Sequence, residues 1–220
     1  HASVSWLLEH ANPLIKVTIV PRGQALGAAW YLPEERTITT KEQMLDEICS
    51  LLGGRAAEEL FTGHISTGAI NDLERVTKSI YGMIAYAGMG TNLPNISYYN
   101  NNEYNFQKPY SETTAKAIDD EAIRMIAEQY DRAKAILTEH KEGHNQLAQL
   151  LIEREVIFAE DVEKIFGKRQ WVSRSQEILE ETNSKAENSP ATENTKSSEE
   201  AKNTENTENS TTPSTDDQNQ

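Results

Sequence analysis

Residues 41–60, KEQMLDEICSLLGGRAAEEL, carry the clearest helical pattern in the chain. Apolar side chains recur there at spacings of three and four, the period of a helix with one buried face: Met44, Leu45, Ile48, Leu51 and Leu52. Thr39 and Thr40 precede this run, where a threonine hydroxyl can cap the first turn. Gly53 and Gly54 each cost about 1 kcal/mol relative to alanine inside a helix. We therefore expect them to permit close backbone packing or a kink.

The same period predicts helices on both sides of this stretch. A helix at 1–11 ends at Asn12-Pro13, because the residue before a proline avoids helical geometry. The long helix at 111–140 needs a packing partner, which we expect to be the helix at 145–153. The remaining predicted helices are at 70–87 and 159–166.

One segment has the alternation of a strand rather than the period of a helix. Residues 14–20 alternate and are rich in β-branched side chains. A turn at Pro21-Arg22-Gly23 leads to a second extended run at 25–32. We expect these two strands to pair at a sheet edge. The predicted fold class is therefore mainly α, with a small β-unit.

The carboxy-terminal residues differ in composition from the rest. Between 182 and 220 the apolar residues are three alanines among Asn, Thr, Ser, Glu and Lys. Such a segment cannot bury enough apolar surface to offset the entropy lost on ordering. We expect one folded domain at 1–168, followed at 169–220 by a linker and an acidic, polar, disordered tail.

Charge, cysteine content and hydropathy exclude several classes of protein. The formal net charge is −14, and no nucleic-acid partner is expected, since such binding requires Lys and Arg against phosphates. The single cysteine, Cys49, excludes an intrachain disulfide framework and a multi-cysteine zinc site. No uninterrupted apolar run approaches the roughly 20 residues of a membrane span, so the chain as written is expected to be soluble. It opens at His1 inside an apolar helical pattern, and we interpret it as a fragment whose upstream part is missing.

Two histidine arrangements bear on metal binding. His140 and His144 are one helical turn apart, but we expect Gly143 to cap a charged helix there, with nothing apolar to exclude water. His1 begins an apolar helix that leads into a strand. Such a segment is what would remain if an H-E-x-x-H zinc helix were cut just before its second histidine. The residues alone leave open both a metal ligand and an ordinary helix histidine at His1.

A set of short motifs extends along the chain in a fixed order. They are Pro21-Arg22-Gly23, Ala25-Leu26-Gly27, Leu32-Pro33, Gly53 to Glu59, Ser66 to Ala69, Asn71-Asp72-Leu73 and Pro109 to Glu112. Together they resemble the peptidase domain of the FtsH family, the membrane-anchored ATP-dependent zinc metalloproteases of bacteria, mitochondria and chloroplasts. The resemblance covers about residues 1–168 and keeps both order and spacing. It implies a helical metallopeptidase domain with the small β-unit near the zinc site.

The resemblance implies which residues bind zinc. It makes His1 the second zinc-binding histidine and Asp72 the third ligand, with the fourth position left to water. Without the resemblance, Asp72 is an acid at the start of a helix that interacts favourably with the helix dipole. Glu58 is implied as an acid that hydrogen-bonds a ligand histidine, or as a ligand itself. The alternative for Glu58 is an exposed helix acid.

The same resemblance implies a substrate-binding strand beside the metal. Its residues are Ala25, Leu26, Gly27, Ala28, Ala29 and Trp30. An extended substrate would add to this strand through main-chain hydrogen bonds, which accept many side chains. The alternative is an edge strand that packs only against its own domain.

For the whole protein the resemblance implies a processive protease. It predicts a homo-hexamer in the bacterial inner (plasma) membrane, with the peptidase domain on the cytoplasmic side, acting on unfolded and membrane proteins. An ATPase module would bind ATP and magnesium, and the peptidase module would bind zinc. The first metal histidine and the catalytic glutamate would precede His1, so the fragment alone is expected to be inactive. The alternative is a non-catalytic helical module for assembly or adaptor binding, derived from such a protease.

Overall fold

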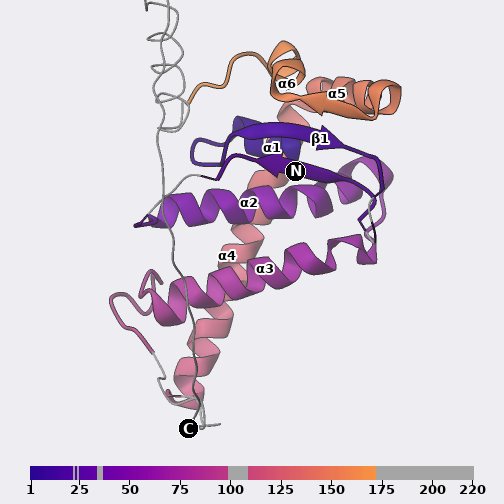
Figure 1. Cartoon of the computed structure of the whole chain (residues 1–220). Helices are drawn as coiled ribbons and strands as arrows, with labels where there is room; N and C mark the ends of the chain where they lie inside the picture. The colour runs from indigo at the N-terminus through magenta and orange to yellow at the C-terminus, as the bar shows by residue number, and fades with distance from the viewer. Residues whose placement is uncertain (22, 24, 34–36, 99–108, 172–220) are drawn as a thin grey trace, which may run out of the picture.

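The computed structural model describes residues 1–21, 23, 25–33, 37–98 and 109–171. These residues form six α-helices: α1 (Ala2–Leu7), α2 (Lys41–Ala57), α3 (Ile70–Tyr81), α4 (Glu112–Glu139), α5 (Lys141–Arg154) and α6 (Ala159–Phe166). They also form three strands, β1 (Leu14–Thr18), β2 (Ala28–Tyr31) and β3 (Val156–Phe158) (Figure 1). The predicted class, mainly α with a small β-unit, is confirmed. Of the predicted linker and tail at 169–220, residues 172–220 lie outside the described residues.

Helix α2 begins with the cap that the threonines predicted. The Thr40 hydroxyl accepts from the Gln43 amide, and the Gln43 side chain accepts from the Thr40 amide at 2.9 Å. These bonds satisfy two N–H groups that a helix start leaves without intrahelical partners. The helix passes through both glycines of the quoted stretch and continues as a π-helical turn, Glu58–Thr62. A Cβ on Gly53 would lie 3.0 Å from Val4 of α1, so the predicted close approach is confirmed.

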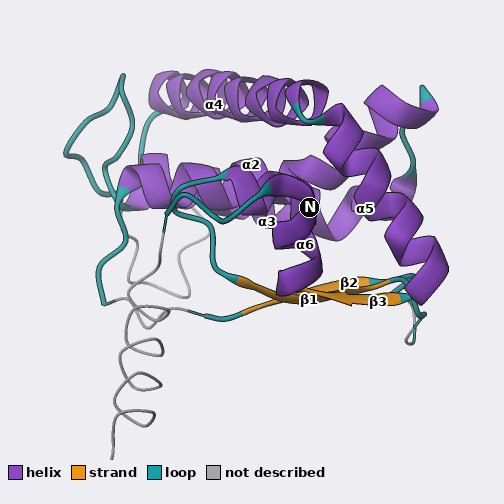
Figure 2. Cartoon of the chain, turned by 90° about the horizontal axis from the view of Figure 1, so that it is seen from above, coloured by secondary structure: helices purple, strands orange, loops and turns teal. Residues whose placement is uncertain are grey.

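The sheet has three antiparallel strands in the order β2-β1-β3, and it lies beside the helical layer (Figure 2). Val17 in β1 lies opposite Ala29 in β2 and Ile157 in β3. The predicted pairing of the first two strands at a sheet edge is therefore confirmed, whereas the third strand, β3, was not predicted. Three residues are too few to show an alternating pattern, so β3 is recognisable only by its pairing. Strand β2 lies at one edge and is shorter than predicted, since residues 25–27 precede it.

Helix α4 begins after Ser111, whose hydroxyl accepts from the Thr114 amide. It packs chiefly against α2 and α3 rather than against the helix at 141–154, and Figure 1 shows it crossing behind both. Their shared core includes Ile48, Leu52, Val76, Ile80, Ile118 and Ala122. Helix α5 instead buries Leu147 and Leu151 against the sheet and α6. The predicted helix pairing is wrong because the apolar stripe of α5 covers the sheet.

Gly143 lies inside α5 and does not cap the preceding helix. Helix α4 ends at Glu139, and His140 separates the two helices. A Cβ on Gly143 would lie 2.6 Å from the Phe166 ring. The predicted cap is therefore wrong, and glycine is needed here because Phe166 of α6 packs directly on the α5 backbone.

A buried carboxylate holds the segment after α1 against the helices. Asp46 on α2 is 3% exposed. It accepts from the His10 amide at 2.9 Å and pairs with Arg132 of α4 at 2.6 Å. A buried acid is tolerated when it is hydrogen-bonded and paired in this way. These contacts fix α1 and the turn that follows it on α2 and α4.

Candidate metal centre

The fold brings together two side chains that lie far apart in the sequence. His1 immediately precedes α1, and Asp72 lies in the first turn of α3. The His1 Nε2 atom lies 3.4 Å from an Asp72 carboxylate oxygen. Both helices pack on α2, which positions the two side chains relative to each other. The structure thus pairs the two residues that the resemblance implied as zinc ligands.

A backbone carbonyl sets the orientation of the His1 ring. The Ser50 carbonyl oxygen lies 3.0 Å from His1 Nδ1. Because a carbonyl can only accept, Nδ1 carries a proton, and Nε2 is the nitrogen that remains for a metal ion. A carbonyl or carboxylate behind the imidazole is typical of metal-binding histidines.

Gly54 makes room for this ring. A Cβ added to Gly54 would overlap the His1 imidazole and lie 2.8 Å from its Cε1 atom. Carbon atoms that are not bonded do not approach so closely, so any side chain at this position must displace the ring. The close approach that the glycine pair predicted therefore accommodates a candidate metal ligand.

The electrostatic surroundings of His1 favour a cation. Burial alone lowers the pKa of the imidazole, but hydrogen bonds to Asp72 and to the Ser50 carbonyl outweigh burial, so the pKa of His1 is raised. Arg75 opposes this effect from one turn beyond Asp72 on α3. The pair can thus hold a positive charge between its side chains. A metal ion would compete with the proton for Nε2.

The spacing of the pair fits zinc. Zn–N and Zn–O bonds of about 2.0–2.2 Å in a tetrahedral site separate two ligand atoms by about 3.4 Å. The distance from His1 Nε2 to Asp72, 3.4 Å, matches this separation. Within the part of the chain that the structure describes, no group of three or more His, Cys, Asp or Glu side chains could hold a metal ion. A zinc ion bound by this pair would thus have two of its four ligand positions filled by described residues.

Glu58 opens the π-helical turn after α2 and contacts the loop that leads into α3. Its carboxylate accepts from the Ser66 hydroxyl at 2.5 Å and from the Ser66 amide at 3.3 Å. These hydrogen bonds lower the pKa of Glu58. Arg55 donates to the Ser66 carbonyl at 3.0 Å. The hydrogen bonds that the structure gives the Glu58 carboxylate thus come from Ser66 rather than from His1.

The six residues of the expected substrate strand are divided between β2 and the turn before it. Residues 28–30 lie in β2, and residues 25–27 precede it. A Cβ on Gly27 would lie 2.6 Å from the Thr18 carbonyl oxygen, so the backbone there runs too close to β1 for a side chain. Among the described residues no strand pairs with the outer edge of β2. In the described part of the chain β2 is thus an edge strand, the kind of strand to which an extended segment can add.

Tyr31, the last residue of β2, was not singled out by sequence reasoning. Its hydroxyl accepts from the Ser5 hydroxyl at 3.3 Å and is hydrogen-bonded to the Ser50 side chain. Burial raises the pKa of Tyr31, the two serines oppose this, and the charge of Asp72 adds to the increase. The signal that could have found it is alternation, which places Tyr31 and Ala29 on the same face of the strand.

The histidines at 140 and 144 have separate packing roles. The His144 ring stacks on Phe61 with 4.4 Å between centroids, and its Nδ1 lies 3.1 Å from the Ser3 hydroxyl. Burial lowers the pKa of His144. His140 lies edge to face against Phe166. The expectation that nothing apolar surrounds this pair is wrong, since each ring packs on a phenylalanine.

Comparison with known proteins supports the family resemblance that the sequence motifs indicated. The model of peptidase family M41 matches residues 1–165. The ATP-dependent zinc metalloprotease FtsH of Parabacteroides distasonis is 69% identical over 182 residues, which are 82% of this chain and 27% of that protein. The ATP-dependent zinc metalloprotease FtsH of Karelsulcia muelleri is 50% identical over 168 residues, which are 75% of this chain and 27% of that protein.

A mitochondrial relative matches over a similar range. The mitochondrial inner membrane m-AAA protease component AFG3L2 of Mus musculus is 44% identical over 197 residues, 88% of this chain and 25% of that protein. The chain thus spans about a quarter of the length of the relatives it matches. The range matched by the family model includes both His1 and Asp72. The resemblance to the FtsH family is confirmed, and the chain belongs to peptidase family M41.

Proposed function

We propose that this chain is the peptidase module of an ATP-dependent zinc metalloendopeptidase. The observation that carries the proposal is the 3.4 Å approach of His1 Nε2 to the Asp72 carboxylate, with the ring held by the Ser50 carbonyl. One imidazole and one carboxylate at this spacing suit a catalytic zinc site, which uses nitrogen and oxygen ligands and keeps one position open. The names of the FtsH relatives, which are zinc metalloproteases, support it.

In this proposal His1 and Asp72 hold the metal. Zinc, when bound, supplies a Lewis acid that activates water and polarises the peptide carbonyl. The Ser50 carbonyl keeps a proton on His1 Nδ1, so that Nε2 presents its lone pair to the site. The first histidine and the general-base glutamate of an H-E-x-x-H helix would come from residues ahead of His1.

The free edge of β2 is the proposed place for substrate. An extended segment would pair with the backbone of residues 28–30, and residues 25–27 would lead it to the strand. The Tyr31 hydroxyl at the end of β2 bonds the side chain of Ser50, whose carbonyl holds His1. A substrate on β2 would therefore lie beside the metal. Main-chain recognition suits an enzyme that degrades many sequences, because it ignores most side chains.

For the whole protein we propose a membrane-anchored, processive protease. It would assemble as a homo-hexamer, bind ATP and magnesium in an ATPase module, and degrade unfolded and membrane proteins. The relatives' names support ATP dependence and, for the mouse protein, an inner-membrane location. The resemblance favours the bacterial inner membrane, with the peptidase module on the cytoplasmic side. Across the described ranges, no helix combines the length and apolarity needed to cross a bilayer.

Glu58 is proposed to position Asp72 rather than to bind zinc. Its carboxylate holds Ser66, and Ser66 accepts from the Gly68 amide at the start of the 3₁₀ turn that leads into α3. Glu58→Ala should therefore lower the zinc affinity of the full-length gene product about tenfold, within the range for groups that orient metal ligands. Competition against a chromophoric zinc chelator measures this change.

Two further variants separate positioning from a general loss of stability. Glu59→Ala removes the neighbouring acid, which accepts from the Tyr130 hydroxyl of α4, and should leave the zinc affinity unchanged. Glu58→Gln keeps one acceptor oxygen for Ser66 and should recover part of the lost affinity. A Glu58→Ala protein that binds zinc as tightly as the wild type would contradict the positioning role.

Metal content and proteolysis of the full-length gene product test the proposed function. We expect stoichiometric zinc by elemental analysis and ATP-dependent cleavage of casein. Removing zinc with a chelator should abolish cleavage, and adding zinc back should restore it. A protein that holds no zinc and leaves casein intact would instead support the alternative, a non-catalytic module for assembly or adaptor binding.

A further inference from the structure

A cavity of about 310 Å³ opens beside the candidate metal centre. Two of its wall residues lie one helical turn from the metal pair: Ser5 follows His1 along α1, and Arg75 follows Asp72 along α3. Ser50, whose carbonyl accepts from the His1 ring, forms another part of the wall. The cavity therefore adjoins the metal pair from α1, α2 and α3 together.

The cavity also reaches the end of the proposed substrate strand. Tyr31 closes β2 and lines the cavity. It lies opposite Leu14, which is buried, so Tyr31 is on the inner face of the sheet. A substrate strand added to β2 would turn alternate side chains toward this inner face. One of these side chains would point toward the cavity.

The cavity wall can form hydrogen bonds but carries little net charge. Ser5 and Ser50 present hydroxyls next to that of Tyr31. At the rim, Glu47 and Arg75 form an ion pair at 3.3 Å. Because this pair already neutralises both rim charges, a charged substrate side chain would find no unpaired opposite charge among them, and the hydration that it gives up costs more than one hydrogen bond returns.

Tyr31 brings a hydroxyl group that can act in both directions. It has one proton and two lone pairs, which it can share among Ser5, Ser50 and a polar group inside the cavity. Ala11 and Leu51 supply apolar surface to the same cavity. A substrate side chain with an apolar stem and a neutral polar end could contact the apolar surface and form hydrogen bonds with the hydroxyl groups of the cavity.

We propose that this cavity is a substrate subsite that selects a neutral hydrogen-bonding side chain, such as Gln, Asn or Tyr, at one position near the cleaved bond. Tyr31 is the residue that makes the selection. The inference rests on the proposed function, because it requires a substrate strand on β2. The proposed subsite adds a preference for one substrate side chain, whereas the rest of the substrate is recognised through main-chain hydrogen bonds.

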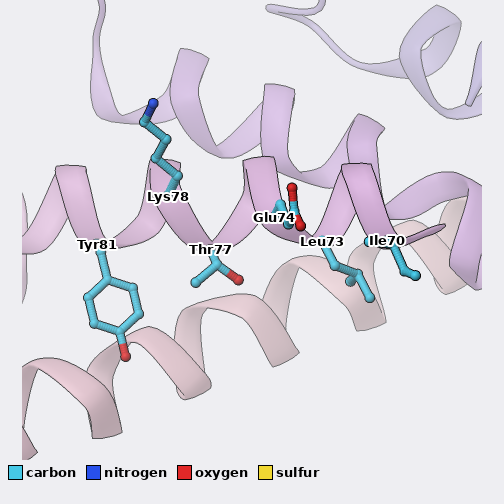
Figure 3. A pocket seen from close by; sticks show the side chains of 6 residues that line it. All are labelled: Ile70, Leu73, Glu74, Thr77, Lys78 and Tyr81. Carbon is cyan, nitrogen blue, oxygen red and sulfur yellow. The ribbon is translucent and has the colours of Figure 1, made fainter. Parts of the chain in front are cut away.

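A hollow on the outer face of α3 supplies the matched control. Its lining includes Ile70, Leu73, Thr77 and Tyr81 (Figure 3). The helical period places Asp72 and Arg75 on the opposite face of α3. The Tyr81 hydroxyl donates to Asp119 of α4 at 2.7 Å. Tyr81→Phe therefore removes a tyrosine hydroxyl at a place that does not adjoin the metal pair.

The test reads the ends of the casein fragments that the full-length gene product releases, by mass spectrometry. In the wild type, neutral polar side chains should be enriched about threefold or more at one fixed position, a ratio that one net hydrogen bond can supply. Tyr31→Phe should lose this enrichment at that position alone. Tyr81→Phe should keep the wild-type pattern.

Glu47→Gln provides an independent variant on the exposed rim of the cavity, where the side chain is 58% exposed and folding is not at risk. It removes the carboxylate that pairs with Arg75. Asp and Glu should then become enriched about threefold at the same position, because a charge-assisted bond to Arg75 becomes available to substrate. If Tyr31→Phe fails to fold, the fragment pattern of Glu47→Gln alone tests the proposed subsite.

The outcomes separate the subsite from the proposed function. Wild-type fragment patterns in both Tyr31→Phe and Glu47→Gln, with zinc bound and casein cleaved, would overturn the subsite and leave the proposed function standing. A wild-type protein that binds no zinc and cleaves no casein would overturn both. A shift confined to one position, with unchanged zinc content, is the result that supports the subsite.

Discussion

Asp72→Asn should lower the zinc affinity of the full-length gene product about a hundredfold or more, since groups that merely orient ligands are already worth 10–100-fold. Asparagine keeps the size of the side chain and one of its oxygens. It removes the negative charge that lies 3.4 Å from His1 Nε2 and would neutralise part of a divalent cation. Casein cleavage should fall in proportion to the zinc lost.

The measurement combines chelator competition for zinc with the rate of casein cleavage. Glu74→Gln is the matched control, because it makes the same change of charge on α3 at a residue lining the outer hollow. It should leave both quantities unchanged. The thermal midpoint of Asp72→Asn should stay close to that of the metal-free wild type, because the variant loses two small contributions: a helix-dipole interaction of about 0.3–1 kcal/mol and the partly exposed ion pair with His1, worth about 0–1 kcal/mol. Stoichiometric zinc and undiminished cleavage in Asp72→Asn would show that the metal-site assignment is wrong.

Gly54→Ala should also remove zinc, through packing instead of charge. The new Cβ would overlap the His1 imidazole, with Cε1 at 2.8 Å, so the ring must leave the place where Nε2 faces Asp72. The hydrogen bond from His1 Nδ1 to the Ser50 carbonyl would break with it. We expect zinc affinity to fall by about a hundredfold, the loss of one oriented ligand.

The same substitution should not weaken the helix that carries it. Alanine is favoured over glycine inside a helix by about 1 kcal/mol. Gly53→Ala is the contrasting control, because its Cβ would press on Val4 at 3.0 Å and should cost about 1–3 kcal/mol of stability without touching the imidazole. Thermal melting and zinc competition should therefore give opposite results for the two variants. Wild-type zinc affinity in Gly54→Ala would mean that the His1 ring lies elsewhere.

Many helices and strands of the fold were predictable because they form from residues that are close together in the sequence. The period of three and four predicted α2, α3, α4 and α6, and the threonine before α2 predicted its cap. The first two strands followed from alternation and a turn, although both are shorter than predicted. The glycine pair indicated a close approach, which the structure shows at Val4 and at His1.

Apart from the bounds of individual helices and strands, the errors concern contacts between distant parts of the chain. Strand β3 is too short to have a pattern of its own, and only its pairing with β1 reveals it. Helix α4 packs on α2 and α3, and α5 packs on the sheet, because the apolar spacing of a helix does not specify which element its apolar face contacts. The predicted cap at Gly143 is wrong because a glycine in a charged segment is compatible both with a helix cap and with a close contact such as that with Phe166.

The candidate site likewise combines features that local sequence patterns predict with features that only tertiary packing determines. Local patterns established the helices that carry His1 and Asp72, and the resemblance named these two residues. Only the folded chain set their atoms 3.4 Å apart, turned Glu58 toward Ser66, and placed Tyr31 on the cavity beside them. Helical period, caps and turns arise from residues within one or two turns of one another, so the sequence records them. A metal pair and a cavity arise from side chains on separate helices and strands, whose distances are decided by how those elements pack.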